Sequence, residues 1–299
     1  MTTKNKIAVL GGDARQLFML RHLLSLNYPV AVWGLGEEGK RRFPEITAPH
    51  WQAALEKATA MILPLPVSAD GVRLRCPLES EALSLRLSIL LEAFSGKLIL
   101  GGRFPEAFLH SAAQKGVEPV DYSASEDFLL NNALLTAEGA IALAMERLPV
   151  AIDGSTVAVI GYGRIGALLA DRLRALGATV LVYARRRDAL TRAALCHHTP
   201  VLLRREDAYQ SLREIPAVCR VIFNTVPQCL FSGTVLEALP KQCLFVDLAS
   251  VPGGLDRAAA DELKIPWIWG TALPGKYAPE SAGRILGQTV GALLEEHLD

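Results

Sequence analysis

The sequence lacks several features, and each absence excludes a class of protein. Its five cysteines are an odd number without a C-x-x-C pair, which predicts reduced thiols in a cytoplasmic protein and no disulfide framework. Lysine plus arginine equals aspartate plus glutamate at 31 each, so the charge favours neither nucleic acid nor a membrane surface as a partner. No apolar run reaches the roughly 18 residues of a membrane span, and the first residues lack the apolar centre of a signal peptide.

Metal ligands and catalytic histidines are also missing where they would be expected. Cys196, His197 and His198 are adjacent in the chain, and three adjacent residues rarely converge on one ion, so we expect no metal site. The six histidines fall in predicted helices and loops and not at strand ends. Hydroxy-acid dehydrogenases of this general architecture use a histidine as acid and base, so a reaction whose base is a carboxylate fits this chain better.

Short apolar stretches alternate with helical patterns along the whole chain. Hydrophobic residues make up 51% of the 299, enough for two domains of about 150 residues each. Strands that alternate with helices imply a parallel, doubly wound sheet. We therefore predict an α/β fold of two doubly wound, Rossmann-like domains with a cleft between them. The expected strands are 6–10, 30–33, 60–65, 97–100 and 117–121 in the first domain, and 156–160, 178–183, 221–224, 244–247 and 267–269 in the second.

The predicted helices set the domain boundaries. Helices are expected at 15–26, 79–94, 137–147 and 279–298. The third of these is expected to begin after Thr136, whose hydroxyl would cap it, and to connect the domains. We predict an N-terminal substrate domain of residues 1–133 with the C-terminal helix 279–299, an interdomain helix at 134–150, and a cofactor domain at 151–278.

The last helix has a glycine on one face at every turn. Gly283, Gly287 and Gly291 are four residues apart, which permits a close approach to another helix. We expect this helix to pack against the interdomain helix and to close the N-terminal domain. A contact between two copies of the chain is the alternative, so a homo-oligomer stays open.

A dinucleotide-binding fingerprint opens the second domain. Residues 156–160 form an apolar strand, Gly161, Gly163 and Gly166 follow in the spacing G-x-G-x-x-G, and an amphipathic helix comes next. The glycines permit a tight turn, a close approach of the backbone to a pyrophosphate, and close packing of helix on strand. The phosphates would lie on the N–H groups at the helix N-terminus. We expect Gly161, Tyr162, Gly163, Arg164, Ile165 and Gly166 to bind the cofactor; the alternative is a glycine-rich turn without a ligand.

The next strand ends in basic residues where NAD-binding folds carry an acid. Ala184 stands near that position and is followed by Arg185, Arg186 and Arg187. A carboxylate would repel a ribose 2′-phosphate, whereas guanidinium groups bind one through charged hydrogen bonds. The sequence therefore favours NADP(H) over NAD(H), with Ala184, Arg185 and Arg186 in contact with the cofactor. An ordinary solvated basic loop is the alternative.

Polar clusters follow several predicted strands, where ligands of doubly wound sheets bind. For the substrate we expect an anion site, with contacts from Gly12, Arg15, Gln16, Ser68, Asp70, Asn132 and Thr136. Along the cofactor we expect Asn224, Thr225, Val226, Pro227, Asp247, Leu248, Ala249, Leu273, Pro274 and Lys276. Turn chemistry or helix capping explains any one cluster equally well, and Lys276 is alternatively a surface lysine.

Taken together, these motifs resemble the A subunits of bacterial dipicolinate synthase. The matching stretches are Gly-Gly-Asp-Ala-Arg-Gln at 11–16, Leu-Pro-Leu-Pro-Val-Ser-Ala-Asp-Gly at 63–71, Thr-Ala-Glu-Gly-Ala-Ile at 136–141, the glycine fingerprint at 161–166 and Leu-Pro-Gly-Lys-Tyr-Ala-Pro at 273–279. They span nearly the whole chain. The fingerprint alone is shared by many dehydrogenases, but the combination is specific.

The resemblance implies a cytoplasmic sporulation enzyme of the mother cell that works with the flavoprotein-like B subunit of dipicolinate synthase. It implies oxidation of dihydrodipicolinate, or of its hydroxy-tetrahydro precursor, to pyridine-2,6-dicarboxylate with a nicotinamide cofactor. From the residues themselves we expect Arg15 to bind a substrate carboxylate. Asp13 and Glu138 are expected to do the acid and base work, with Glu126 in reserve.

Two other functions remain open at this point. One is an NADP-linked two-domain dehydrogenase that acts on a different hydroxy or amino acid. The other is a non-catalytic subunit that binds NADP(H) and regulates a partner which carries out the redox step. Product profiling on the dihydro intermediate separates the first from dipicolinate formation, and hydride transfer by the purified chain would argue against the second.

Overall fold

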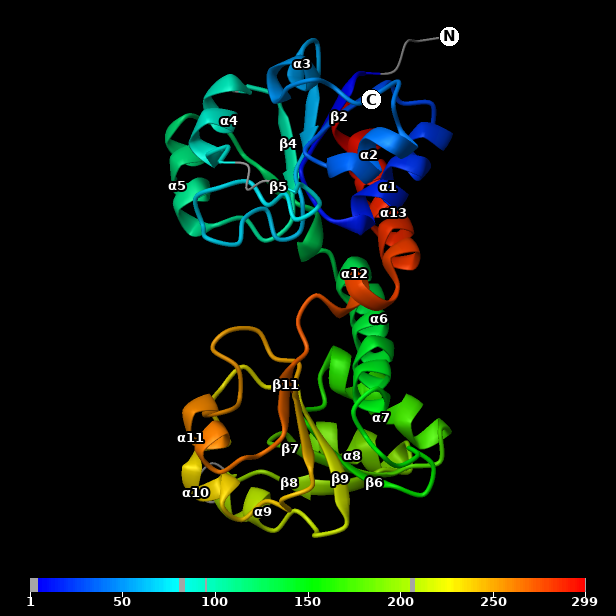
Figure 1. The fold of residues 1–299 in the computed structure, drawn as a ribbon, viewed down its shortest axis with the longest axis vertical. Helices are drawn as coiled ribbons and strands as arrows, with labels where there is room; N and C mark the ends of the chain where they lie inside the picture. The colour runs from blue at the N-terminus through cyan, green and yellow to red at the C-terminus, as the bar shows by residue number, and fades with distance from the viewer. Residues whose placement is uncertain (1–4, 81–83, 95, 205–207, 299) are drawn as a thin grey trace. The chain divides into compact units, whose positions relative to one another are not determined.

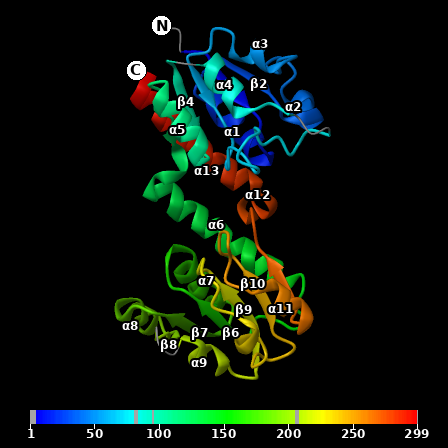
Figure 2. The same ribbon diagram turned by 90° about the vertical axis from the view of Figure 1, so that its left-hand side faces the viewer.

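The computed structural model describes residues 5–80, 84–94, 96–204 and 208–298. The chain forms two compact units (Figures 1 and 2). Unit 1 comprises Met1–Asn131 with Ala278–Asp299, and unit 2 comprises Asn132–Tyr277. Each unit has a parallel sheet, so the α/β fold with two Rossmann-like sheets that the sequence predicts is confirmed.

Unit 1 contains a five-stranded parallel sheet in the order β2-β1-β3-β4-β5. Its central strands are buried along their whole length because helices cover both faces. Helix α1 and the C-terminal helix α13 share one buried core, and α3, α4 and α5 share the other. The strands are β1 (Ile7–Leu10), β2 (Val30–Trp33), β3 (Ala60–Ile62), β4 (Leu98–Gly101) and β5 (Val120–Asp121); the helices are α1 (Ala14–Ser25), α2 (Gly36–Arg42), α3 (Trp51–Leu55), α4 (Leu87–Ala93), α5 (Glu106–Gln114), the 3₁₀ turn η1 (Tyr122–Ala124) and α13 (Pro279–Leu298).

The glycine face of α13 packs on α1. A Cβ atom added at Gly283 would collide with the Arg15 carbonyl oxygen, and one added at Gly287 would stand 2.8 Å from the Cβ atom of His22. The sequence predicted this helix and the close approach, but it named the interdomain helix as the partner. The spacing of the glycines determines which face of α13 has no side chains. It carries no information about which helix packs against that face.

The predicted helix at 79–94 is wrong for most of its length. Among the described residues only Leu87–Ala93 is helical. The chain before it is extended because it pairs with the preceding segment: the Leu74 N–H donates to the Leu85 carbonyl and the Leu87 N–H to the Val72 carbonyl, at 2.9 and 3.0 Å. Residues 81–83 lie outside the described part of the chain.

The helix shared by the two units, α6 (Glu126–Met145), begins ten residues before Thr136. Thr136 is interior, and its hydroxyl donates to the carbonyl of Asn132 at 2.7 Å. The cap is Ser125, whose hydroxyl accepts from the Phe128 N–H at 3.2 Å. By length and composition α6 would pass for a membrane span, but 56% of its 18-residue apolar window is buried within the protein, as in a core helix.

Unit 2 contains a six-stranded parallel sheet in the order β11-β10-β9-β6-β7-β8, the order of dinucleotide-binding folds. Strand β8 was not predicted; Pro200 interrupts its apolar pattern, and β8 lies at the edge where proline is tolerated. The strands are β6 (Thr156–Ile160), β7 (Thr179–Ala184), β8 (Thr199–Leu202), β9 (Cys219–Asn224), β10 (Leu244–Asp247) and β11 (Trp267–Trp269); the helices are α7 (Arg164–Ala175), α8 (Arg187–Leu195), α9 (Ala208–Arg213), α10 (Gly233–Leu236), α11 (Arg257–Glu262) and α12 (Leu273–Tyr277).

Candidate cofactor and substrate sites

The glycine loop joins β6 to α7 at the carboxyl edge of the unit 2 sheet. Gly161 has a φ of +94°, and a Cβ atom there would collide with the Thr225 hydroxyl. At Gly166 a Cβ atom would collide with the Gly161 carbonyl oxygen, so this glycine lets α7 approach the strand. At Gly163 a Cβ atom would meet nothing within 4 Å. Two glycines are therefore needed by the protein itself, and the third faces open space.

The beginning of α7 is suited to an anion. Gly163 is the N-cap residue and provides no side-chain hydrogen bond to the first turn. An uncapped helix N-terminus presents backbone N–H groups and the positive end of the helix dipole. Together with the open space at Gly163, this geometry fits a dinucleotide pyrophosphate.

Tyr162 and Ile165 point into the protein and not into that space. The Tyr162 ring lies edge-on to His198, with ring centroids 6.0 Å apart, and burial with a hydrogen bond to Cys196 raises the pKa of its hydroxyl. His198 in turn contacts the Asp171 carboxylate at 2.9 Å. Ile165 packs on the hydrophobic core. Only their backbone is therefore placed for the cofactor contact that the sequence predicts.

The arginine run follows β7, the neighbour of β6 in the sheet. Ala184 is buried, whereas Arg185, Arg186 and Arg187 are exposed. Arg186 is already paired, since its Nε and Nη2 atoms donate to the Asp188 carboxylate at 2.9 and 2.6 Å. Among the described residues, Arg185 has only a long contact of 3.5 Å with the Gln228 amide oxygen. Arg185 is thus the better placed of the two for a phosphate.

Asn224 and Asp247 hold the ends of β9 and β10 together. Both are buried, and the Asn224 amide donates to the Asp247 carboxylate at 2.8 Å. The same carboxylate accepts from the N–H groups of Ala249 and Gly254. The predicted cofactor residues Asn224 and Asp247 therefore shape the loops at this edge.

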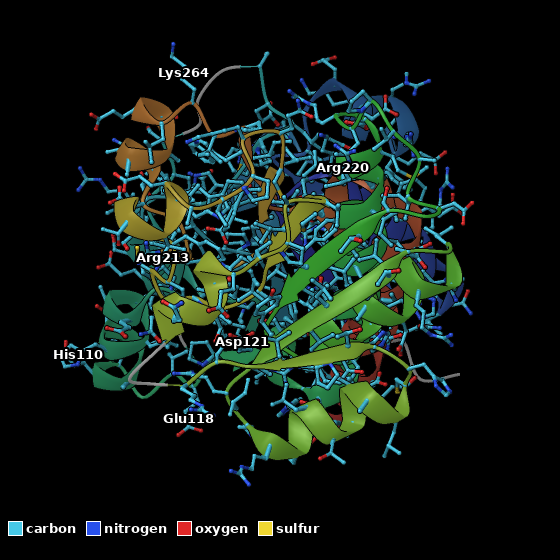
Figure 3. The ribbon with its side chains drawn as sticks, turned by 90° about the horizontal axis from the view of Figure 1, so that it is seen from below. His110, Glu118, Asp121, Arg213, Arg220 and Lys264 are labelled. Carbon is cyan, nitrogen blue, oxygen red and sulfur yellow. The ribbon has the colours of Figure 1, made fainter. Side chains whose placement is uncertain are left out.

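Some neighbours of these two residues hold the loops in place, and others are exposed at the surface. Thr225 ties the loop after β9 to the glycine loop, with its hydroxyl donating to the Ile160 carbonyl at 2.9 Å. Leu248 and Ala249 are buried, Val226 is half-buried and Pro227 is exposed. Arg220, the second residue of β9, lies at the opposite, amino edge of the sheet and is half-buried (Figure 3).

Helix α12 packs on α6 within unit 2. A Cβ atom at Gly139 would stand 2.9 Å from the Leu273 side chain, and Leu273 and Pro274 are buried. Lys276 is exposed, and its ammonium group donates to the Tyr277 hydroxyl at 3.1 Å. The Tyr277 hydroxyl donates to Glu146 at 3.0 Å. Leu273 and Pro274 thus act in packing, and Lys276 is presented at the surface.

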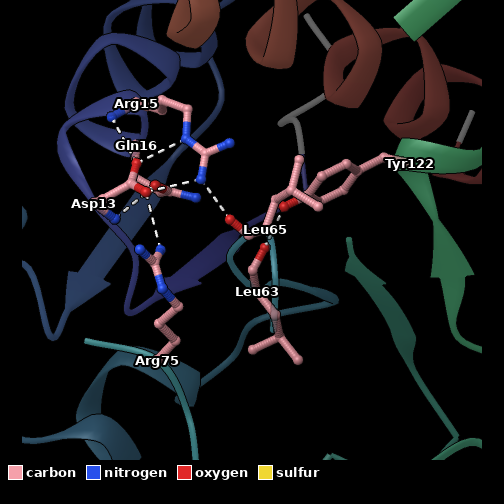
Figure 4. Close-up of polar contacts among 7 residues, drawn as sticks. All are labelled: Asp13, Arg15, Gln16, Leu63, Leu65, Arg75 and Tyr122. Atoms are coloured by element: carbon pink, nitrogen blue, oxygen red, sulfur yellow. Dashed lines mark hydrogen bonds and ion pairs between the residues drawn. The ribbon is translucent and has the colours of Figure 1, made fainter. Parts of the chain in front are cut away.

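Unit 1 carries a partly buried charged cluster at the start of α1 (Figure 4). Arg15 donates to both oxygens of the Asp13 carboxylate, at 2.8 and 2.7 Å, and also to the Leu65 carbonyl. Arg75 donates to the same carboxylate at 2.9 Å. Asp13 caps α1, with its carboxylate accepting from the Arg15 N–H and its own N–H donating to the Gln16 amide oxygen. Two guanidinium groups thus share one carboxylate.

Sequence reasoning found Asp13, Arg15 and Gln16 but missed Arg75. The loop after β3 delivers Arg75, and Asp70 shapes that loop by accepting from the Ser68 hydroxyl and from the N–H groups of Val72 and Arg73. These bonds, the backbone ones first, lower the pKa of Asp70 to about 2. The Gly12 N–H then donates to the Arg75 carbonyl at 2.9 Å. Ser68 and Asp70 thus act on the loop, and no motif in the sequence marked Arg75.

The predicted acid and base residues have different surroundings. Burial favours the neutral form of Asp13, but the hydrogen bonds and charge of Arg15 and the bond from Arg75 outweigh it and lower its pKa to about 2. A carboxylate that ionises at so low a pH is a weak base near neutrality. Glu138 of α6 is exposed and lies 3.5 Å from Arg172 of α7. Glu126 is the first residue of α6.

The sheet order, the glycine loop and the uncapped α7 together define unit 2 as a dinucleotide-binding domain. Residues 128–250 match the NAD-binding domain of D-isomer specific 2-hydroxyacid dehydrogenases. The chain is thereby an oxidoreductase that uses a nicotinamide cofactor. A D-lactate dehydrogenase from Salmonella shares the fold, with a TM-score of 0.62 at 14% identity over 98% of this chain and 97% of that one.

Unit 1 narrows the class to one family. Residues 6–123 match the N-terminal domain of the dipicolinate synthase A subunit. The chain is 30% identical to the dipicolinate synthase A subunit of Bacillus subtilis over 99% of its length and 98% of the relative's. The crystal structure of the corresponding protein from Bacillus halodurans has a TM-score of 0.86 at 28% identity over 98% of this chain and 99% of that one. The chain belongs to the family of dipicolinate synthase A subunits, as the motifs predicted.

Proposed function

We propose that the chain oxidises dihydrodipicolinate, or its hydroxy-tetrahydro precursor, to pyridine-2,6-dicarboxylate with NADP⁺. The observation that carries the proposal is the match to the A subunit of dipicolinate synthase along the full length of both chains. Because that relative is one subunit of its enzyme, we further propose a complex with the flavoprotein-like B subunit, in the cytoplasm of the mother cell of a sporulating bacterium.

The preference for NADP(H) rests on the loop after β7. Strand β7 ends at Ala184 and not at an acid, and the exposed Arg185 offers a guanidinium group near the expected position of the adenosine ribose. A ribose 2′-phosphate accepts charged hydrogen bonds from such a group, whereas the 2′-hydroxyl of NAD(H) gains little from it. Family membership supports a nicotinamide cofactor of either kind, and Arg185 supports the phosphorylated one.

The chemistry calls for two functions from the protein. Aromatisation of the dihydro ring loses one hydride, for which a bound nicotinamide would be the acceptor, and one proton from a ring position. The hydroxy-tetrahydro precursor must lose one water in addition, and an acid must protonate the leaving hydroxyl. We propose Arg15 as a carboxylate-binding residue and Glu138 as the acceptor of the proton, with Glu126 in reserve. Asp13, with its pKa of about 2, is proposed to act through Arg15 and Arg75 by holding their guanidinium groups in place.

A coupled assay tests the proposal. The purified chain receives NADP⁺ or NAD⁺ and a dihydrodipicolinate supply from the enzyme that forms it, with and without the B subunit, and reduced cofactor and dipicolinate are followed together. We expect both products in equal amounts and faster with NADP⁺. Products that require the B subunit would move the redox step to the complex. NADPH binding without turnover in any mixture would contradict the proposal and favour a sensing role.

A further inference from the structure

The cluster at the start of α1 contains two positively charged side chains and one negatively charged one. Arg15 and Arg75 share the Asp13 carboxylate, and the side chains of the three are only 8%, 21% and 16% exposed. Among the described residues no second carboxylate contacts either guanidinium group, so one of the two positive charges has no ion-pair partner in a largely desolvated place. Buried charges in proteins are normally paired, so the cluster is suited to accept a further anion.

The cluster lies where the sheet of unit 1 is built to bind a ligand. Strand β2 lies on one side of β1 and β3 on the other. The connections that leave β1 and β3 therefore diverge, and ligands of open α/β sheets bind at such a point, beyond the carboxyl ends of the strands. Arg15 comes from the connection after β1. Arg75 and Leu65, whose carbonyl Arg15 contacts, come from the connection after β3.

An unpaired donor provides an independent sign of a ligand. Gln16 is 1% exposed, and its amide oxygen accepts from the Asp13 N–H at 2.9 Å. This bond fixes which end of the amide is the nitrogen. The Nε2 atom is buried and has no acceptor among the residues that the structure describes. Figure 4 shows the Gln16 amide beside the Asp13 carboxylate, which Arg15 and Arg75 both contact.

The two arginines differ in what they have left to offer. Arg15 donates through Nε and Nη2 to Asp13, and through Nη2 to the Leu65 carbonyl, which fixes it to the fold. Arg75 donates through Nη1 alone, as far as the described residues show, and it is the more exposed of the two. Its Nε and Nη2 atoms stay available, and a planar pair of N–H donors matches the two oxygens of a carboxylate.

We propose that Arg75 is a specificity-determining residue that binds one carboxylate of the substrate, together with Arg15 and the Gln16 amide nitrogen. The inference rests on the proposed function in taking the ligand to be a pyridine dicarboxylate. Asp13 is the positioning residue that holds both guanidinium groups. The site discriminates a carboxylate from a neutral amide of the same shape because only the carboxylate neutralises the surplus charge and accepts from every donor.

Binding and turnover of Arg75→Gln and Arg75→Lys test the inference on the full chain. Calorimetry measures the Kd of pyridine-2,6-dicarboxylate, of pyridine-2,6-dicarboxamide and of NADPH. The matched control is Arg73→Gln, which removes the same charge from an exposed position on the same loop. We expect Arg75→Gln to weaken dicarboxylate binding at least tenfold, to leave NADPH binding within twofold, and to raise the KM of the coupled assay more than it lowers kcat. Arg75→Lys should fall between wild type and Arg75→Gln, because it keeps the charge and loses the planar fork.

The outcomes separate this inference from the proposed function. Dicarboxylate binding that depends on Arg75, without any formation of dipicolinate, would keep the site and overturn the proposed reaction. Turnover with the same KM in wild type and Arg75→Gln would keep the reaction and overturn the site. Equal losses of dicarboxylate affinity in Arg75→Gln and Arg73→Gln would show that only the net charge of the loop matters, which would overturn the site. Equal affinity for dicarboxylate and dicarboxamide would overturn the carboxylate assignment. A wild type that neither binds the dicarboxylate nor turns over would overturn both.

Discussion

The helices α1 and α7 begin in contrasting ways although both follow a central strand and a glycine turn. At α1 the Asp13 carboxylate caps the first turn and attracts Arg15 and Arg75. At α7 the N-cap is Gly163, which provides no capping side chain and borders open space. One helix therefore carries its own anion, and the other is open to one from a ligand.

This contrast suits the two helix starts to the two different ligands proposed above. With its own carboxylate in place, the start of α1 no longer offers a phosphate site, and the surplus charge lies on side chains that surround it. The start of α7 has no such carboxylate and presents free backbone N–H groups. These groups can bind a pyrophosphate without help from any side chain. Changing either N-cap residue should therefore affect one unit and leave the other intact.

Removal of the built-in anion should have the largest effect. Asp13→Ala leaves the buried Arg15 without its partner, and breaking such a pair costs about 3–5 kcal/mol of stability. Asp13→Asn keeps an acceptor for the cap and should cost less. Hydrogen exchange of the α1 amides measures the loss locally, with the α7 amides as the internal reference. A similar loss of protection in both helices would contradict the independence of the two sites.

Filling the open space at α7 should abolish cofactor binding without harming the fold. Apart from its chain neighbours, no described residue comes within 4 Å of a Cβ atom added at Gly163, and its φ is −88°, so Gly163→Val should keep the fold and cost no more than about 1 kcal/mol for the poorer N-cap. We expect its NADPH affinity to fall at least a hundredfold, or about 2.7 kcal/mol, because the side chain takes the place of the pyrophosphate. Gly233→Val, at the start of α10, is the control, since Gly233 also has room for a Cβ atom. Unchanged NADPH affinity in Gly163→Val would refute the placement of the cofactor.

The Asp13 carboxylate should also make unit 1 sensitive to acid. Its pKa falls from 3.8 to about 2 in the folded protein, so the ion pairs contribute about 2 kcal/mol that is fully present above pH 3.8 and is lost as the pH falls through 2. The free energy of unfolding of the wild type should therefore fall toward that of Asp13→Asn between pH 4 and 2. Parallel curves over this range would show that Asp13 does not have the lowered pKa.

The predictable part of the fold is the part that local rules determine. Gly161 and Gly166 are fixed by contacts within a few residues of the turn and by the Thr225 hydroxyl, and the spacing alone predicted their roles. The start of α6 was also within reach: Ser125, followed by the acids Glu126 and Asp127, is an ordinary capping pattern. The error came from giving weight to Thr136, whose hydroxyl bonds within the helix.

The features that the sequence did not predict depend on contacts between residues far apart in the chain, and the spacing of residues in a motif does not reveal such contacts. Arg75 reaches Asp13 from 62 residues away, and only the fold of the loop after β3 brings them together. Asn224 and Asp247 were predicted at the cofactor because they follow strands, and that rule locates them correctly at the carboxyl edge. It does not reveal that each is buried and bonded to the other, 23 residues apart.

Within the arginine run, the preference for NADP(H) should depend on Arg185 more than on Arg186. Arg185→Ala should weaken NADPH binding by about 1–2 kcal/mol, the lower range for a charged hydrogen bond because the site is exposed, and should barely change NADH binding. Arg186→Ala is the matched control: its guanidinium is held by Asp188, so the loss should be smaller. Titration with both cofactors at low and high salt measures the effect, which salt should reduce. Equal losses for NADPH and NADH would contradict the 2′-phosphate assignment. The arginine run would then be an ordinary solvated loop with no part in the choice of cofactor.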